Sequence, residues 1–358
     1  MASVNDCRRD RLEALWSLVF QGGWDRLWRL FDPPEGLGLR DQVIPPNVLA
    51  QHGIFLERHS FNLSTTAESN LSLDPPILFE FRSPAIFSQY PIAPEPGDYL
   101  YNHAPESYFN LVADTLGRPL RGAEAIGLFV TEWALAGYSR AGLPANTPNL
   151  ATLCNIAPIL SPHPLLPPRP VCDGINWYER EPGNQWLSSL YEYRLSTPTG
   201  MPRFPHVILV TSVSCAGEDG SITKGELGAL ITAMHNRSQQ PAVFDEDAAM
   251  ASDSDDSMEV QSGVDAEDAD FAFGQEQRFP VLMLSFLGRR HGRITYACMD
   301  GMQIVIRQSQ RYRFVDGDCD PSEVLTLFAC ALLSTPLSET SEQDWEIVEA
   351  LAECQLGQ

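Results

Sequence analysis

The stretch FPVLMLSFLGRRHGRITYACMDGMQIVIRQ, residues 279–308, contains three apolar runs that are separated by two short polar breaks. The second and third runs are joined by Asp300-Gly301, a dipeptide that is favoured in the tight turns of β-hairpins. The sequence therefore predicts three consecutive antiparallel strands, a meander. If Asp300 and Gly301 occupy the centre of the turn, Ile294 lies opposite Arg307.

The residues before this stretch predict a buried strand followed by a helix. HVILVTSV (206–213) is an almost unbroken apolar run, which is typical of a central strand. TKGELGALITAMHNR (223–237) follows, and Thr223 and Glu226 have the spacing of a capping box. Strands and helices are mixed without a regular βα repeat. We therefore expect an α+β fold, with a mixed or antiparallel sheet, flanking helices and a helical N-terminal region.

Composition divides the chain into regions. Residues 1–150 are expected to be mainly helical and irregular, because a Trp-rich amphipathic segment at 8–31 precedes a long stretch rich in Pro, Ser and Asn. Residues 171–335 are expected to form an α+β module. Ser341 is a candidate N-cap for a C-terminal helix within 336–358.

One acidic segment carries about half of the formal net charge of −23. Between Ala242 and Asp270 there are eleven acidic residues and no basic residue. So high a charge density, with few large apolar side chains, cannot offset the entropy lost on ordering. We therefore predict a disordered acidic loop at 242–276, inserted in the α+β module.

Positive charge concentrates directly after this acidic segment. Residues 288–314 contain six arginines and one histidine against a single acid, Asp300. In the expected register, the basic residues gather at the end of the hairpin far from its turn, where several guanidinium groups could bind a phosphate or a carboxylate. The alternative is that arginines at strand ends are solvated and protect the sheet edge. The predicted anion-binding residues are Arg289, Arg290, His291, Arg293, Arg307 and Arg311.

Motifs for known catalytic and metal chemistry are absent from the sequence. There is no nucleophile elbow, phosphate-binding Gly-rich loop or zinc-protease motif, and the eight cysteines form no C-x-x-C pair. We expect no metal and no cofactor, and the sequence assigns no catalytic residue. No run approaches the roughly 20 apolar residues that span a bilayer, and no secretory signal is evident, so a cytoplasmic or nuclear location is expected.

The K-G-E helix start at 224–226, and the P-V-L strand, H-G-R turn and D-G hairpin within 280–314, together resemble a family of filamentous-fungal proteins with no assigned activity. The resemblance covers residues 200–335. It implies a fungal protein and supplies no catalytic residue. Members of such families often lie in accessory gene neighbourhoods, including secondary-metabolite clusters.

We expect a non-enzymatic binding or regulatory protein whose arginine-rich surface binds an anionic ligand or an acidic protein surface. We further hypothesise that residues 245–270 fold back and mask this surface. The net negative charge disfavours nucleic acid as a partner, and the sequence specifies no oligomeric state. The alternative is an enzyme, including a degenerate PD-(D/E)xK-like nuclease fold accessory to a secondary-metabolite pathway. Its pocket would use Asp173, Glu192 or Glu226 beside Lys224.

Overall fold

The computed structural model describes residues 4–20, 43–93, 119–159, 172–173, 176–179, 186–194, 204–240, 271–314 and 320–338. Three predicted features lie wholly or mainly outside these residues. They are the acidic loop, of which only 271–276 is described, the C-terminal helix, and the second half of the N-terminal amphipathic segment. Within the described part, no helix is long and apolar enough to cross a membrane.

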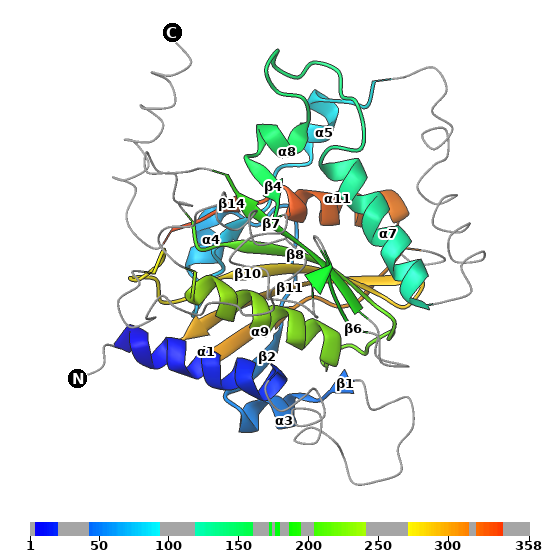
Figure 1. Cartoon of the computed structure of the whole chain (residues 1–358). Coiled ribbons are helices and arrows are strands. Elements are labelled where there is room, and N and C mark those ends of the chain that lie inside the picture. The colour runs from blue at the N-terminus through cyan, green and yellow to red at the C-terminus, as the bar shows by residue number, and fades with distance from the viewer. Residues whose placement is uncertain are drawn as a thin grey trace, which may run out of the picture.

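A mixed sheet forms the centre of the described chain, and the α+β fold class is confirmed (Figure 1). Its ten described strands are β2 (Ile54–Arg58), β4 (Ile156–Pro158), β5 (Cys172–Asp173), β6 (Asn176–Glu179), β7 (Trp186–Tyr193), β8 (Val207–Val213), β10 (Val281–Leu287), β11 (His291–Asp300), β12 (Gln303–Gln308) and β13 (Tyr312–Arg313). The main order is β2-β12-β11-β10-β8-β7-β6-β5, while β13 pairs with β11 and β4 with β7.

One direction is shared by β8, β10, β12 and β2. β8 is parallel to β10, and β12 is parallel to β2. Both β10 and β12 are antiparallel to the strand between them, β11. The C-terminal ends of β8, β10, β12 and β2 therefore lie at one edge of the sheet.

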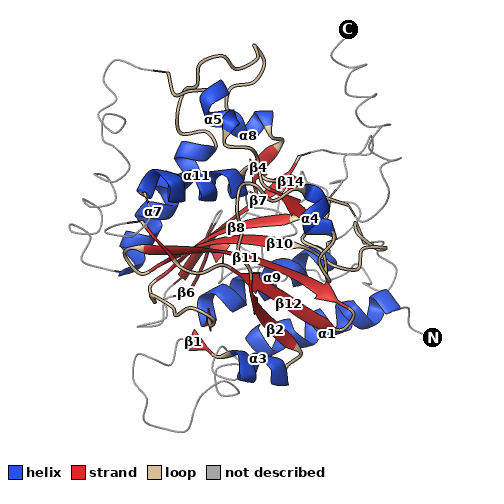
Figure 2. Ribbon diagram, turned by 180° about the vertical axis from the view of Figure 1, so that it is seen from behind, coloured by secondary structure: helices blue, strands red, loops and turns tan. Residues whose placement is uncertain are grey.

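Helices cover both faces of the sheet. On one face lie α9 (Lys224–Ser238) and α1 (Val4–Phe20), which contact each other. Figure 1 shows them in front of the sheet, and Figure 2 shows the sheet from the other side. The opposite face packs against α7 (Pro119–Ala134) and α11 (Pro321–Leu332). The remaining described elements are α3 (Pro46–Gln51), α4 (Ala67–Leu71), α5 (Ala85–Gln89), α8 (Leu150–Leu153), and the short pairs β1 (Val43–Ile44) with β9 (Ile222–Thr223) and β3 (Phe79–Glu80) with β14 (Thr335–Pro336).

Alternate residues of the central strands belong to two separate apolar cores, because successive side chains of a strand point to opposite faces. On β11, Ile294, Tyr296 and Cys298 pack with α7 and α11. Ala297 and Met299 of the same strand pack with α9 and α1. Within one strand, residues with odd numbers and residues with even numbers therefore have their side chains on opposite faces of the sheet.

The predicted meander of β10, β11 and β12 is confirmed, but its expected register is wrong by two residues. Asp300 pairs with Gln303, and Arg307 lies opposite Tyr296 instead of Ile294. Gly301, with φ of +59°, is the first of the two turn residues. Type II′ turns favour glycine at that position, whereas the Asp-Gly prediction placed it second. A shift of two residues leaves every side chain on its expected face.

Strand β2 lies in the N-terminal region, where we expected helices and irregular chain. It extends the sheet beyond the meander by pairing in parallel with β12. Only Ile54 of its five residues is buried, and Phe55 is exposed. So short a segment, with one buried residue, carries little periodic signal in the sequence.

Candidate functional site

The edge where β8, β10 and β12 end is the best-formed candidate site in the described structure. Loops 214–221, 288–290 and 309–311 meet there, and α9 begins there. In open sheets with parallel strands, ligands bind preferentially beyond the C-terminal strand ends. The N-terminus of a helix also contributes partial positive charge. Both features suit an anion.

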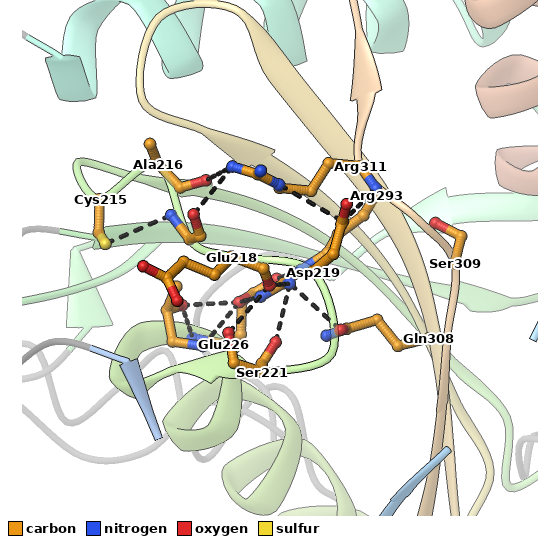
Figure 3. Close-up of polar contacts among 12 residues, drawn as sticks. Cys215, Ala216, Glu218, Asp219, Ser221, Glu226, Arg293, Gln308, Ser309 and Arg311 are labelled. Carbon is orange, nitrogen blue, oxygen red and sulfur yellow. Dashed lines mark hydrogen bonds and ion pairs between the residues drawn. The ribbon is translucent and has the colours of Figure 1, made fainter. Parts of the chain in front are cut away.

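The β8–β9 loop fixes the position of Arg311 (Figure 3). The Arg311 Nη1 donates to the Gly217 carbonyl over 2.9 Å and to the Ala216 carbonyl over 3.4 Å. The Asp219 Oδ1 accepts a hydrogen bond of 2.8 Å from the Arg311 backbone N–H and lies 3.4 Å from its Nε. Because Gly217 has φ of +61°, a conformation that favours glycine, the loop can present its carbonyl in this way. The side chain of Arg311 remains 27% exposed.

Three further basic residues lie around the same point. His291 pairs with Arg313 across β11 and β13, which places their side chains on one face. The backbone of Arg290 is fixed by a hydrogen bond of 2.8 Å from the Phe314 N–H. His291 is half-buried, and its pKa is lowered first by burial and then by the charges of Arg311, Arg313 and Arg290, while Asp219 opposes this shift. We call Arg290, His291, Arg311 and Arg313 the basic rim.

Arg313 was absent from the predicted anion-binding residues, although it lies in the basic stretch 288–314. The sequence analysis predicted no strand beyond β12. Arg313 could have been found from its position two residues after Arg311, because side chains two residues apart in an extended chain lie on the same side.

Arg293 lies beneath the rim and is fully buried. Its Nε donates to Glu226 Oε1 over 2.7 Å, and its Nη2 forms an ion pair with Glu226 Oε2. The Nη1 donates to the carbonyls of Glu218 and Ser221 and to Gln308 Oε1, over 3.0, 2.8 and 3.1 Å (Figure 3). Arg293 therefore ties the β8–β9 loop and α9 to the meander, and its guanidinium is enclosed by protein groups.

Glu226 is both the partner of Arg293 and the cap of α9. Its Oε2 accepts from the Thr223 backbone N–H over 2.9 Å, and its own N–H donates to the Thr223 Oγ1 over 3.2 Å. The predicted capping box is therefore confirmed. Burial alone would raise the pKa of Glu226, but the charge and hydrogen bonds of Arg293, with the bonds from Thr223, hold that pKa below its usual value.

Arg307 and Arg289 lie apart from the basic rim. Arg307 points to the face opposite Arg293, where it donates to the carbonyls of Pro75 and, over 2.8 Å, Asp74. The backbone of Arg289 packs against α7, since a Cβ added to Gly122 would lie 3.1 Å from the Arg289 Cα. The structure thus brings together three of the six predicted residues, Arg290, His291 and Arg311, and separates Arg289, Arg293 and Arg307. In the predicted register, Arg307 lies opposite Ile294, so its side chain and that of Arg293 are on different faces of the sheet there as well.

Two of the carboxylates considered for an enzyme pocket, Glu192 and Glu226, lie at opposite ends of α9. Glu192 pairs with Arg237 over 2.9 Å at the C-terminal end of α9, whereas Glu226 and Lys224 lie at its N-terminal end. The side chain of Asp173 lies outside the described residues. Among the residues that the structure describes, no group of three or more His, Cys, Asp or Glu side chains could hold a metal ion.

Comparison of the chain with protein-family models, with curated proteins and with solved structures finds no match. Relatives therefore supply neither a family nor a transferable site for this protein. A function can therefore be inferred only from the chemistry of the edge where β8, β10 and β12 end. That edge presents four basic groups, and one of them, Arg311, has the carboxylate of Asp219 as a direct partner.

Proposed function

We propose that the protein is a non-enzymatic binding or regulatory protein, and that the basic rim binds an anionic ligand or an acidic surface of a partner protein. The observation that carries the proposal is the pairing of His291 with Arg313 beside the anchored Arg311. Backbone contacts thereby hold the four basic residues of the rim near one another, and hydrogen bonds also fix the Arg311 guanidinium. Arg311 therefore loses little side-chain freedom when an anion binds.

The surroundings of the rim also support an anion. Guanidinium groups bind phosphate and carboxylate oxygens in a fork geometry. Asp219, the acid in contact with Arg311, is itself a carboxylate at that point. The rim thus already accommodates one oxyanion group from the protein's own chain.

Arg290→Ala combined with Arg313→Ala should weaken the binding of pyrophosphate by about tenfold to a hundredfold, because two charge-assisted hydrogen bonds are lost. Isothermal titration calorimetry at low ionic strength measures this change. Parallel titrations with an oligo-glutamate peptide distinguish a small anion from an acidic protein surface. These two arginines are chosen because Arg311 also supports the β8–β9 loop.

Arg121→Ala is the matched control, since Arg121 is an exposed arginine on α7 that pairs only locally with Glu124 over 2.7 Å. The control variant should bind pyrophosphate like the parent protein. Equal affinities of the parent and the double variant, with both folded, would contradict the proposed function. So would the absence of binding to both anions.

We also propose that residues 245–270 fold back over the rim and mask it. The described residues on either side of this acidic segment are held at the other end of α9. The Ala272 N–H donates to the Gln240 carbonyl over 2.8 Å. Arg9 of α1 donates to the carbonyls of Ser238 and Phe273 over 3.0 and 3.1 Å. These contacts lie at the C-terminal end of α9, about 22 Å from its N-terminus. At about 3.4 Å per residue, residues 241–270 could extend about 50 Å and return, which is enough to reach the rim.

Replacing residues 243–270 with a short Gly-Ser linker should raise the affinity for pyrophosphate about threefold to tenfold at low salt, because competing carboxylates are removed. The gain should disappear at high salt, where exposed charge pairs are screened. A variant of full length with Asn and Gln in place of the acids is the matched control and should behave like the deletion. Unchanged affinity at low salt in both variants would reject masking.

A further inference from the structure

We infer that the basic rim takes up a proton at His291 when it binds its anion, so that it selects compact oxyanions of two negative charges and binds them more tightly as the pH falls. The inference rests on the proposed function. It goes further by naming the class of ligand and the way in which binding is regulated.

The position of His291 carries this inference. It is the first residue of β11, half-buried, and its backbone pairs with Arg313 of β13. Arg311 and Asp219 face it from the segment before β13 and from the β8–β9 loop, and Arg290 precedes it in the β10–β11 turn. An anion held by the three guanidinium groups would therefore lie within electrostatic reach of the imidazole.

A bound anion would reverse the net electrostatic effect of the surroundings on the protonation of His291. In the unliganded protein, burial and the three arginines lower the pKa of His291, and Asp219 only partly offsets them. The neutral form of the imidazole is therefore favoured in the unliganded protein. A bound dianion would cancel the positive field of the arginines and accept a hydrogen bond from the protonated ring, so the pKa of His291 should rise in the complex.

Thermodynamic linkage gives the sign of the pH dependence. Because the pKa of His291 is lower in the free protein than in the complex, the complex holds more protons at any pH between the two values. Affinity should be weakest above the pKa of the complex and increase as the pH falls towards that of the free protein. Within this window, the dissociation constant changes by up to about tenfold per pH unit. A singly charged anion should produce a smaller rise in pKa and a weaker dependence.

Sulfate is the suitable probe, because it remains a dianion throughout the pH range in which histidine titrates. The protein is labelled with ¹³C at histidine, and the ring Cε1–H signal of His291 is assigned by its disappearance in His291→Gln. Titration with and without saturating sulfate should show the midpoint of His291 raised by about one pH unit or more. Calorimetry in two buffers of different ionisation enthalpy should show proton uptake on sulfate binding, which is lost in His291→Gln.

His59→Gln is the matched control. His59 is also a partly buried histidine with a lowered pKa, due first to burial and then to Arg307. It follows β2 at the same edge of the sheet, but on the face of Arg307, opposite the face of His291 and Arg293. This variant should retain the full proton uptake. Sulfate binding without any change in the midpoint of His291, or equal uptake in His291→Gln, would overturn the inference while leaving anion binding intact. Absence of sulfate and pyrophosphate binding would instead overturn the proposed function, and the inference with it.

Discussion

Arg293→Met should lower the free energy of unfolding by about 3–5 kcal/mol, because it leaves the fully buried carboxylate of Glu226 without its cationic partner. Urea denaturation at neutral pH, followed by circular dichroism, measures the change. The loss should shrink as the pH falls. In the variant, burial without Arg293 raises the pKa of Glu226, so acid neutralises the carboxyl and removes the unpaired charge.

Two further variants separate the charge pair from the other roles of Glu226. Adding Glu226→Gln to Arg293→Met should recover much of the stability, since the amide keeps the capping contacts to Thr223 and carries no charge. Arg121→Ala removes an exposed ion pair and should cost no more than about 1 kcal/mol. A loss below about 1 kcal/mol in Arg293→Met would mean that water reaches Glu226, contrary to its burial.

The second large effect concerns acid stability and His206. The ring of His206 is buried among Phe79, Tyr193 and Phe204, and its Nε2 lies 2.8 Å from the Leu78 carbonyl oxygen. Burial lowers its pKa from 6.5 to about 3. Between these values, the unfolded chain binds a proton that the folded protein excludes, so stability falls as the pH falls. The contribution of His206 to the slope should approach about 1.4 kcal/mol per pH unit, which amounts to roughly 2 kcal/mol between pH 6.5 and pH 4.5 because the unfolded histidine is only half protonated at pH 6.5.

His206→Gln should flatten this dependence. The amide can still donate to the Leu78 carbonyl but does not titrate, so the variant should lose less stability than the parent protein between neutral pH and pH 4.5. Urea denaturation at a series of pH values measures the slope for each protein. Identical slopes in the parent and His206→Gln would show that His206 is protonated in the folded protein, and would contradict the expectation.

The elements that the sequence predicted well are those with several consistent local signals. Helix α9 combines a capping box with apolar residues at helical spacing, and β8 and β10 are long apolar runs. Strands β2 and β13 were missed because they are short and take their stability from a neighbouring strand, β12 or β11. Such pairing depends on the tertiary structure, so the sequence of one short strand does not predict it.

The candidate site was predicted only in part, for a reason that concerns side-chain direction and burial. The predicted hairpin identified Arg290, His291 and Arg311, because it brings the loop before its first strand close to the exit of its second strand. It could not reveal that Arg293 is fully buried, because its partner Glu226 lies 67 residues away in the chain. The capping box indicated only a local role for Glu226, so its second role as a counter-ion appeared with the tertiary structure.

The closure at Gln240 and Ala272 has a practical consequence for engineering. One backbone hydrogen bond joins these residues, while Arg9 and Arg237 fasten the flanking backbone to α1 and to the carbonyl of His206. The chain between them thus leaves and re-enters the fold at nearly the same point, which is the geometry that tolerates inserted domains. A fluorescent reporter could be grafted there with little strain on the sheet, and would provide a tethered sensor for ligands of the opposite edge.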